Sequence, residues 1–277
     1  MSRAAIGIDA DDLAAGRPYA ERLERDLPWH DRAAEFLVAT AVKPIRDRLQ
    51  RPSDALKQIL AHVERHADAF HAATDADLAA MARGMRGPLR RDGFVPELVG
   101  KCFALVREAA MRTIGKRHYD SQLIAGWALL QGKLIEMATG EGKTIAATLP
   151  AATVALAGYP VHVITVNDYL AKRDADEMGP LFGFLSLSVG AVVQGMPKPE
   201  RRQAYEQSVT YCTNKELAFD YLRDRVAMTK RGSRLHLTLE KLRGDTRRDE
   251  ELVLRGLYFG IVDEADSVFI EDRKSVV

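Results

Sequence analysis

The sequence predicts an α/β fold in which a helical N-terminal region precedes a mostly parallel sheet. Three observations carry this prediction: short apolar runs alternate with helical patterns after Gly132, a glycine-rich loop precedes one of those helices, and two acidic residues end a later apolar run. Strands that alternate with helices form βαβ units, whose strands lie parallel in one sheet.

The N-terminal part of the chain is predicted to be helical. Residues 32–86 are rich in alanine and are interrupted at Pro44, Pro52 and the cap signal at residues 74–75, which predicts three helices. Residues 94–115 carry an apolar stripe at helical spacing, which predicts a further amphipathic helix. We therefore divide the chain into a helical region, residues 1–93, and an α/β domain, residues 94–277.

The rest of the chain reads as strands alternating with helices. The runs predicted as strands are residues 133–137, 161–166, 187–193, 209–213 and 259–262, and those predicted as helices are residues 144–158, 168–178, 198–207 and 215–224. A charged segment, residues 228–255, is expected to be an excursion from the sheet.

Composition excludes several classes of protein. The chain is 47% hydrophobic and 29% charged, which is typical of a globular protein. Forty Lys and Arg against thirty-nine Asp and Glu leave a net charge of +1, so no overall basic field favours binding to nucleic acid. Cys102 and Cys212 show no metal-ligand spacing and suit a reducing compartment, where thiols stay free.

The sequence also predicts neither a secretory signal nor a membrane span. Three aspartates within residues 9–12 stand where the apolar core of a signal would lie, which predicts a cytoplasmic protein. Residues 144–166 lack formal charge over about the length of a bilayer span. Because Pro150, Gly158 and Pro160 interrupt this stretch, we expect a helix, a turn and a buried strand there.

The first chemical motif is the glycine-rich loop TGEGKT, between the predicted strand KLIEM and a helix. In such a P-loop, backbone N–H groups surround phosphates and the helix N-terminus adds positive potential. Lys143 is expected to reach the β- and γ-phosphates, and Thr144 to bind Mg²⁺. The general pattern has a glycine where this chain has Met137. The residues predicted to bind nucleotide phosphate are Gly140, Glu141, Gly142, Lys143 and Thr144.

The second motif is the acidic pair that ends the apolar run FGIV. In P-loop NTPases an aspartate at a neighbouring strand end holds Mg²⁺, and an adjacent glutamate orients and deprotonates the attacking water. We assign these roles to Asp263 and Glu264. Both motifs together, each at a strand end, predict binding of ATP with Mg²⁺.

A third element, RHYDSQ, precedes the P-loop. The side-chain amide of Gln122 offers a donor and an acceptor, which match the N6-amino group and N7 on the edge of adenine. Gln122 is therefore a candidate for selecting ATP over GTP, although spacing alone leaves open that it is simply a polar residue.

Longer stretches around these motifs resemble the SecA family of preprotein-translocation ATPases. The similar stretches are RHYDSQLIAGWALLQGKLIEMATGEGKTIAATLPA, VHVITVNDYLAKRDADEMGPLFGFLSLSVG, VTYCTNKELAFDYLRD and VDEADSV. TVNDYLAKRDA and TNKELAFDYLRD are not requirements of phosphate binding in general. The resemblance covers roughly residues 72–270 and implies a RecA-like, helicase-type P-loop domain in residues 94–277, the first of the two in the family.

The resemblance implies a role for each matching residue. Gln122 would contact adenine, residues 140–144 the phosphates, and Asp263 the Mg²⁺ ion. Glu264 and Lys143 would be catalytic, and Arg173, in the KRDA element, would lie near the nucleotide.

The resemblance also implies the biological setting. Members of the family couple ATP hydrolysis to the movement of preproteins through the Sec channel, at the cytoplasmic face of an anionic membrane. We therefore expect a cytoplasmic, peripherally membrane-associated protein whose partners are preproteins and that channel, with no nucleic acid.

The chain departs from the family pattern in several places. Residues 1–70 match weakly and residues 228–255 are longer than their counterpart, which indicates a divergent member. The family continues with a second RecA-like domain and other elements that these 277 residues do not contain. We therefore expect the 277-residue polypeptide to bind ATP but to hydrolyse it slowly. A further hypothesis is that the terminal DRKSVV, residues 272–277, comes from a sequencing adapter, which the downstream reading frame would test.

Two alternatives stay open at this point. Residues 263–266 spell DEAD, the signature of an RNA helicase, but the chain has TVNDYLAKRDA where such helicases have PTRELA. The near-neutral charge also provides no basic stripe for a nucleic-acid backbone. The other alternative is a non-catalytic ATP-binding module.

Overall fold

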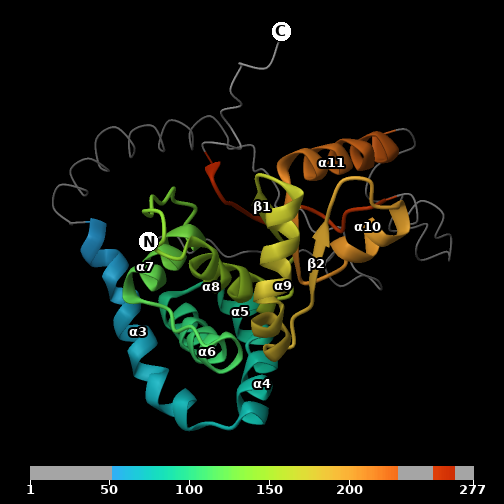
Figure 1. Cartoon of the computed structure of the whole chain (residues 1–277). Coiled ribbons are helices and arrows are strands. Elements are labelled where there is room, and N and C mark those ends of the chain that lie inside the picture. Colours follow the sequence, from blue (N-terminus) through green and yellow to red (C-terminus); the bar gives the residue numbers. More distant parts are fainter. Residues whose placement is uncertain (1–51, 230–251, 266–277) are drawn as a thin grey trace, which may run out of the picture.

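The computed structural model describes residues 52–229 and 252–265 (Figure 1). Three expectations lie outside the described residues: the helices before residue 52, most of the charged segment 228–255, and the terminal residues 272–277.

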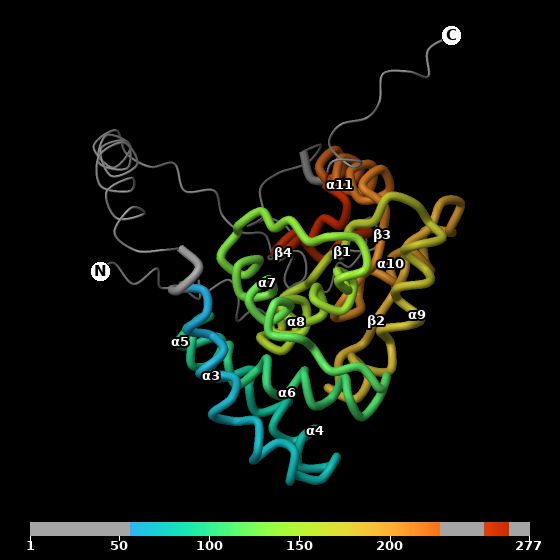
Figure 2. The backbone as a smooth tube through the Cα atoms, turned by 60° about the vertical axis from the view of Figure 1, so that its left-hand side comes forward, coloured from blue at the N-terminus to red at the C-terminus, as the bar shows by residue number. Residues whose placement is uncertain are grey.

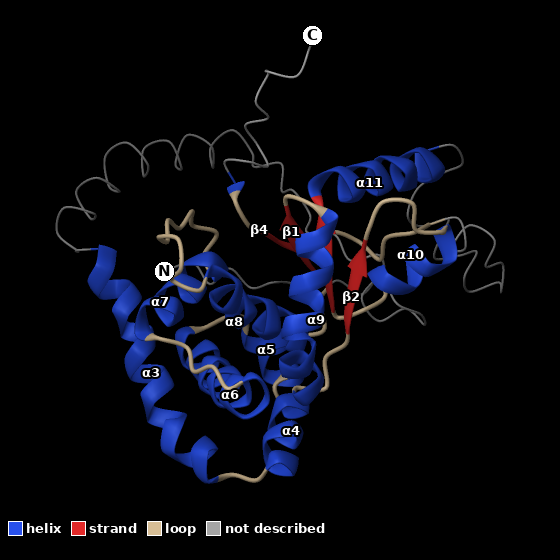
Figure 3. Ribbon diagram, viewed as in Figure 1, coloured by secondary structure: helices blue, strands red, loops and turns tan. Residues whose placement is uncertain are grey.

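The sheet confirms the predicted α/β class. Within the described residues it contains β1 (Val161–Thr165), β2 (Val189–Val192), β3 (Val209–Thr213) and β4 (Phe259–Val262), in the order β2-β3-β1-β4. All three pairings are parallel, and the register places Val161 beside both Val209 and Phe259. The strands are the arrows in Figure 3. Their carboxyl ends therefore meet at one edge of the sheet, where α/β folds bind ligands.

Helices account for most of the remaining described residues. Before the sheet come α3 (Pro52–Ala72), α4 (Asp75–Gly84), α5 (Arg86–Asp92), α6 (Pro96–Ile114) and α7 (Asp120–Leu130). Alternating with the strands come α8 (Lys143–Leu156), α9 (Asp168–Phe184), α10 (Lys198–Tyr205) and α11 (Asn214–Thr229). Figure 2 shows α3, α4 and α6 grouped on one side of the sheet region.

The two faces of the sheet are packed by different helices. On one face, Val163 and Tyr211 belong to a large apolar core that includes residues of α6, α8 and α9. On the other face, Cys212 lies in a smaller core with Tyr205 of α10, against which Leu217 of α11 packs. Successive residues of a strand point to opposite faces, so Tyr211 and Cys212 enter different cores.

Local signals set some of the helix boundaries as predicted, whereas α9 and α11 run past the predicted ends at residues 178 and 224. The Thr74 hydroxyl accepts from the Asp77 amide at 3.2 Å, and the Asp77 carboxylate accepts from the Thr74 amide at 3.3 Å, which forms a capping box at the start of α4. Pro150 lies inside α8 and does not end it, whereas Gly158, at φ 85°, forms the turn before β1. The large core contains residues on both sides of residue 93, and the domain division there stays a prediction.

One predicted strand is wrong. Residues 133–138 form no strand, and the side chain of Leu134 is 90% exposed. The pairings of the described sheet involve only β1 to β4, so residues 133–138 pair with no described strand. An apolar run becomes a strand only where a partner backbone lies beside it, and a local pattern does not supply that partner.

No helix in the described ranges combines the length and the apolar character needed to cross a bilayer.

Candidate nucleotide-binding site

The glycine-rich loop ends at the first residue of α8. Gly140 and Gly142 have φ angles of 89° and 77°, values that other residues adopt at a cost. The carboxylate of Glu141 accepts from the Ala138 amide at 2.9 Å, which closes the loop on itself. Lys143 is the first residue of α8, and its side chain is exposed, with no hydrogen bond or ion pair to any described residue. The sequence thus places a free cation at a helix N-terminus, where anions bind.

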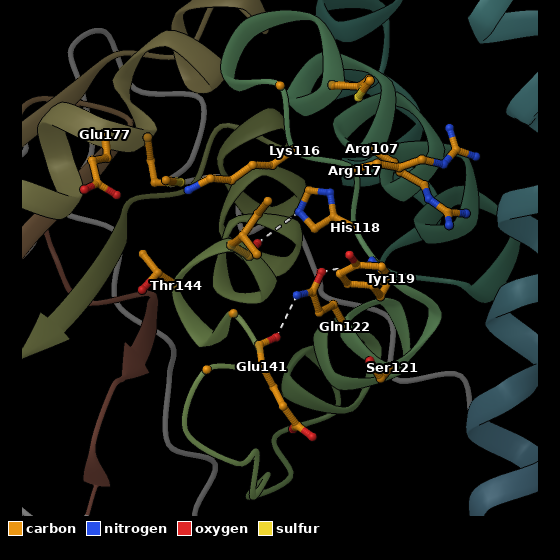
Figure 4. A pocket seen from close by; sticks show the side chains of 16 residues that line it. Arg107, Lys116, Arg117, His118, Tyr119, Ser121, Gln122, Glu141, Thr144 and Glu177 are labelled. Atoms are coloured by element: carbon orange, nitrogen blue, oxygen red, sulfur yellow. Dashed lines mark hydrogen bonds between the residues drawn. The ribbon is translucent and has the colours of Figure 1, made fainter.

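Gln122 lies directly beside this loop. It is 3% exposed, and its side-chain amide donates to the carbonyl of Glu141 at 2.8 Å. Its side-chain carbonyl accepts from the Tyr119 amide at 2.9 Å, at the start of α7. Figure 4 shows the Gln122 amide directed at the loop. One N–H and one carbonyl lone pair of Gln122 remain for a ligand.

His118 makes a second connection between the same segment and α8. The imidazole is 0% exposed, and its Nε2 lies 3.0 Å from the Ile145 carbonyl and 3.1 Å from the Thr148 hydroxyl. Burial, with a smaller contribution from the charge of Arg107, lowers the pKa of His118 to about 4, although the hydrogen bond to the Ile145 carbonyl acts to raise it. The imidazole is therefore neutral at physiological pH.

A cavity of about 830 Å³ opens between this segment, the loop and α9. Its volume lies within the range of small-molecule sites, about 300–1,000 Å³. Of the residues predicted to bind nucleotide, those that line it are Gln122, Gly140, Glu141, Gly142 and Thr144. These residues come from two segments that are separate in the sequence, and the fold brings them to one cavity (Figure 4).

The predicted acidic residues follow β4 at the carboxyl edge of the sheet. The Asp263 amide donates to the Ile164 carbonyl at 2.9 Å, which extends the ladder to β1 by one residue. The Glu264 amide donates to the Asp263 carboxylate at 3.0 Å, and Glu264 has a φ of 55° and is exposed. Asp263 and Glu264 are not among the residues that line the cavity, nor are Lys143 and Arg173.

Arg173 is paired within its own helix. Its Nε and Nη2 donate to the Asp174 carboxylate at 2.9 and 2.6 Å. Burial raises the pKa of Asp174, Arg173 lowers it, and the negative charge of nearby Asp263 raises it again. Arg173 is therefore linked through Asp174 to the acidic end of β4.

The donor groups fit a magnesium ion. Mg²⁺ prefers oxygen ligands and is usually held by one or two protein groups, water and substrate phosphates. Thr144 offers a hydroxyl and Asp263 a carboxylate, which are ligands of this kind.

Sequence reasoning missed several residues of the cavity wall. Arg107, Lys116, His118 and Glu177 line the cavity and were not assigned a role. His118 stands within the RHYDSQ element, so its position was visible. Its burial and its contact with α8 were not, because they depend on packing between segments.

A parallel sheet, a glycine-rich loop at the start of a helix and an acidic residue at a neighbouring strand end together define a RecA-like P-loop domain. Comparisons with known proteins specify the family. The family model of the SecA DEAD-like domain matches residues 42–276, and the chain belongs to the SecA family.

Relatives agree with this assignment. The protein translocase subunit SecA 2 of Bordetella avium is 44% identical over 252 residues, which cover 91% of this chain and 38% of the relative. The corresponding SecA 2 of Nitrosospira multiformis is 42% identical over 281 residues, or 99% of this chain and 41% of the relative. The protein translocase subunit SecA of Caldicellulosiruptor saccharolyticus is 43% identical over 226 residues, or 82% and 24%. The chain thus spans about two fifths or less of these three relatives.

Proposed function

We propose that this chain is the ATP-binding motor domain of a protein-translocating ATPase. The observation that carries the proposal is the bond between the Gln122 amide and the Glu141 carbonyl. It places a residue suited to reading adenine against the loop suited to binding phosphates, at the wall of one cavity. A nucleotide needs both kinds of group within its own length.

Each of the predicted site residues has a role in the proposed binding or hydrolysis of ATP. Gln122 reads the base, the backbone of residues 140–144 surrounds the phosphates, and Lys143 offsets their charge. Thr144 and Asp263 would hold Mg²⁺, which would supply positive charge that stabilises the phosphates during transfer. Glu264 accepts the proton of the attacking water. For Arg173 to contact the nucleotide, as the family resemblance implies, its ion pair with Asp174 has to open.

The whole protein is proposed to couple this hydrolysis to preprotein transport through the Sec channel. The names of the relatives support this coupling, since each is called a protein translocase subunit. We further propose that it works in the cytoplasm and associates peripherally with the anionic inner face of the membrane.

Calorimetric titration of the 277-residue chain tests the proposal. We expect Mg-ADP and Mg-ATP to bind and guanine nucleotides to bind more weakly. Lys143→Ala should weaken Mg-ADP binding by at least about tenfold, since it removes a charge-assisted hydrogen bond. Lys172→Ala is the matched control, because Lys172 is an exposed lysine of α9 that does not line the cavity. Equal affinities for wild type and Lys143→Ala would refute the site.

A further inference from the structure

The segment at residues 118–122 is hydrogen-bonded to the chain just before Gly142 and just after Thr144. Gln122 donates to the carbonyl of Glu141, just before Gly142. His118 lies 3.0 Å from the carbonyl of Ile145, just after Thr144. These two contacts therefore lie on either side of Gly142, Lys143 and Thr144, which are three of the five residues expected to bind phosphate.

The hydrogen-bond pattern fixes which nitrogen of His118 carries the proton. The Thr148 hydroxyl donates to the Ile145 carbonyl at 2.6 Å, so its own proton is already used. The two neighbours of Nε2 are thus both acceptors, and Nε2 must be the donor. Nδ1 is then unprotonated, and it has no hydrogen-bond partner among the described residues.

Burial makes this contact specific. His118 is 0% exposed, so water cannot replace the imidazole at the Ile145 carbonyl. A ring flip would leave a protonated nitrogen without an acceptor and is therefore unfavourable. The donor at Nε2 has one role, which is to hold the first turn of α8 against the cavity wall.

We propose that His118 is a positioning residue for phosphate binding: its Nε2–H holds the first turn of α8 so that Lys143 and Thr144 face the phosphates. The proposal rests on the proposed ATP-binding function. In this role His118 acts through Ile145. Gln122 holds the other end of the same three residues while it lines the cavity.

The test compares a nucleotide with two phosphates to one with a single phosphate. The ratio of the AMP and ADP dissociation constants measures what the phosphate loop contributes, because base and ribose are common to both. Titrations would use wild type, His118→Ala and His118→Gln. The glutamine amide can place an N–H donor close to the position of the imidazole Nε2. Thr153→Val is the matched control. Thr153 is a buried residue of α8 whose hydroxyl donates to the Leu149 carbonyl at 2.8 Å, away from His118.

We expect His118→Ala to reduce the ratio of the AMP to the ADP dissociation constant about five- to tenfold, which is the effect of one lost hydrogen bond. The affinity for AMP should change little. His118→Gln should restore most of the ratio, and Thr153→Val should leave it within about twofold of wild type. A lower unfolding midpoint in His118→Ala with an unchanged ratio would overturn the proposal and leave a purely structural role. Absence of Mg-ADP binding by the wild type would refute the proposed function instead.

Amide hydrogen exchange measures the stability of the first turn of α8 without any ligand. The Ala146 amide donates to the Gly142 carbonyl at 3.0 Å, which is a bond of the first turn of α8. His118→Ala should raise the exchange rate of that amide about five- to tenfold, and His118→Gln should not. Should His118→Ala fail to fold, His118→Gln still tests the proposal: a His118→Gln protein that binds AMP normally but has lost the ADP preference would contradict it.

Discussion

The side-chain nitrogen of Gln122 lies 2.8 Å from the Glu141 carbonyl, and the same nitrogen would lie 2.6 Å from a Cβ atom at position 142. Two separate features of the structure thus require glycine at position 142. Its φ of 77° disfavours other residues, and its missing side chain makes room for Gln122.

Gly142→Ala is expected to remove nucleotide binding. Alanine would adopt the left-handed conformation at a cost of about 1–2 kcal/mol and would displace the Gln122 amide from the loop. Titration with Mg-ADP measures the loss. Gly132→Ala is the control, because Gly132 also has a positive φ, 70°, but a Cβ atom there would have no described neighbour within 4 Å. It should lower stability and keep the affinity, and a Gly142→Ala protein with wild-type affinity would show that the contact is dispensable.

Gln122→Ala is expected to reduce the preference for adenine over guanine. The substitution removes the free N–H and the free lone pair that match the adenine edge. It also removes the bond to Glu141, so some loss of overall affinity should accompany the loss of discrimination. Competition between ATP and GTP for the site measures the preference. An unchanged ATP-to-GTP affinity ratio would remove Gln122 from base recognition.

The 277-residue polypeptide is expected to bind Mg-ATP and to hydrolyse it near background. By the family resemblance, a second RecA-like domain supplies arginines that stabilise the transferred phosphate, and such residues are worth about 10³–10⁵ in rate. Fusion to the downstream domains of a relative should restore turnover, and Glu264→Gln should abolish it again without loss of binding. Brisk hydrolysis by the 277 residues alone, lost in Lys143→Ala, would contradict this expectation.

Arg112 is expected to stabilise the packing of α6 against the preceding helices through its hydrogen bonds. Its guanidinium donates to the carbonyls of Phe70, His71 and Ala73 at 3.0–3.1 Å and to the carboxylates of Asp75 and Glu108, both at 2.7 Å. Arg112→Met should lower the free energy of unfolding by about 2–3 kcal/mol, since it leaves several acceptors near the buried Glu108 without their donor.

Urea denaturation measures this loss. Arg112→Lys should recover only part of it, because lysine keeps the charge and loses the planar fork. A full recovery by lysine would show that charge alone matters at this position.

Stability is expected to fall as the pH is lowered from about 6.5 toward 4. Burial chiefly, and to a smaller extent the charges of nearby Arg107 and Arg255, respectively, lower the pKa values of His118 and His162 from 6.5 to about 4. Between these pH values the unfolded chain binds protons that the folded chain does not. The contribution of the two histidines to the free energy of unfolding is therefore complete above pH 6.5 and is lost as the pH falls toward 4. Each histidine can contribute on the order of 3 kcal/mol.

Urea unfolding at several pH values tests this dependence. The raised pKa values of Asp174 and Asp224, both caused chiefly by burial, act in the opposite direction, so the test is a difference between variants. His162→Phe, which removes one titrating group, should show a shallower loss of stability than wild type. Identical pH dependence in the two proteins would contradict the assigned cause.

The sequence by itself determined much of this protein. Helical periodicity, the cap at Thr74 and the glycine turns placed α4, α6 and α8, because these signals act over a few residues. The P-loop and the acidic pair predicted nucleotide binding, since phosphate binding requires particular residue types in a particular order. The longer stretches TVNDYLAKRDA and TNKELAFDYLRD predicted the family, which the family model confirms.

Only the tertiary structure decided which of these residues meet. The sequence predicted a strand at residues 133–137, and the structure has none, because strand formation depends on a partner backbone that lies elsewhere in the chain. The proximity of Gln122 to Glu141, and of His118 to Ile145, follows from the packing of α7 against α8. Contacts between residues 19 and 27 positions apart leave no local pattern, so the two contacts on either side of Gly142, Lys143 and Thr144 appear only once the chain is folded.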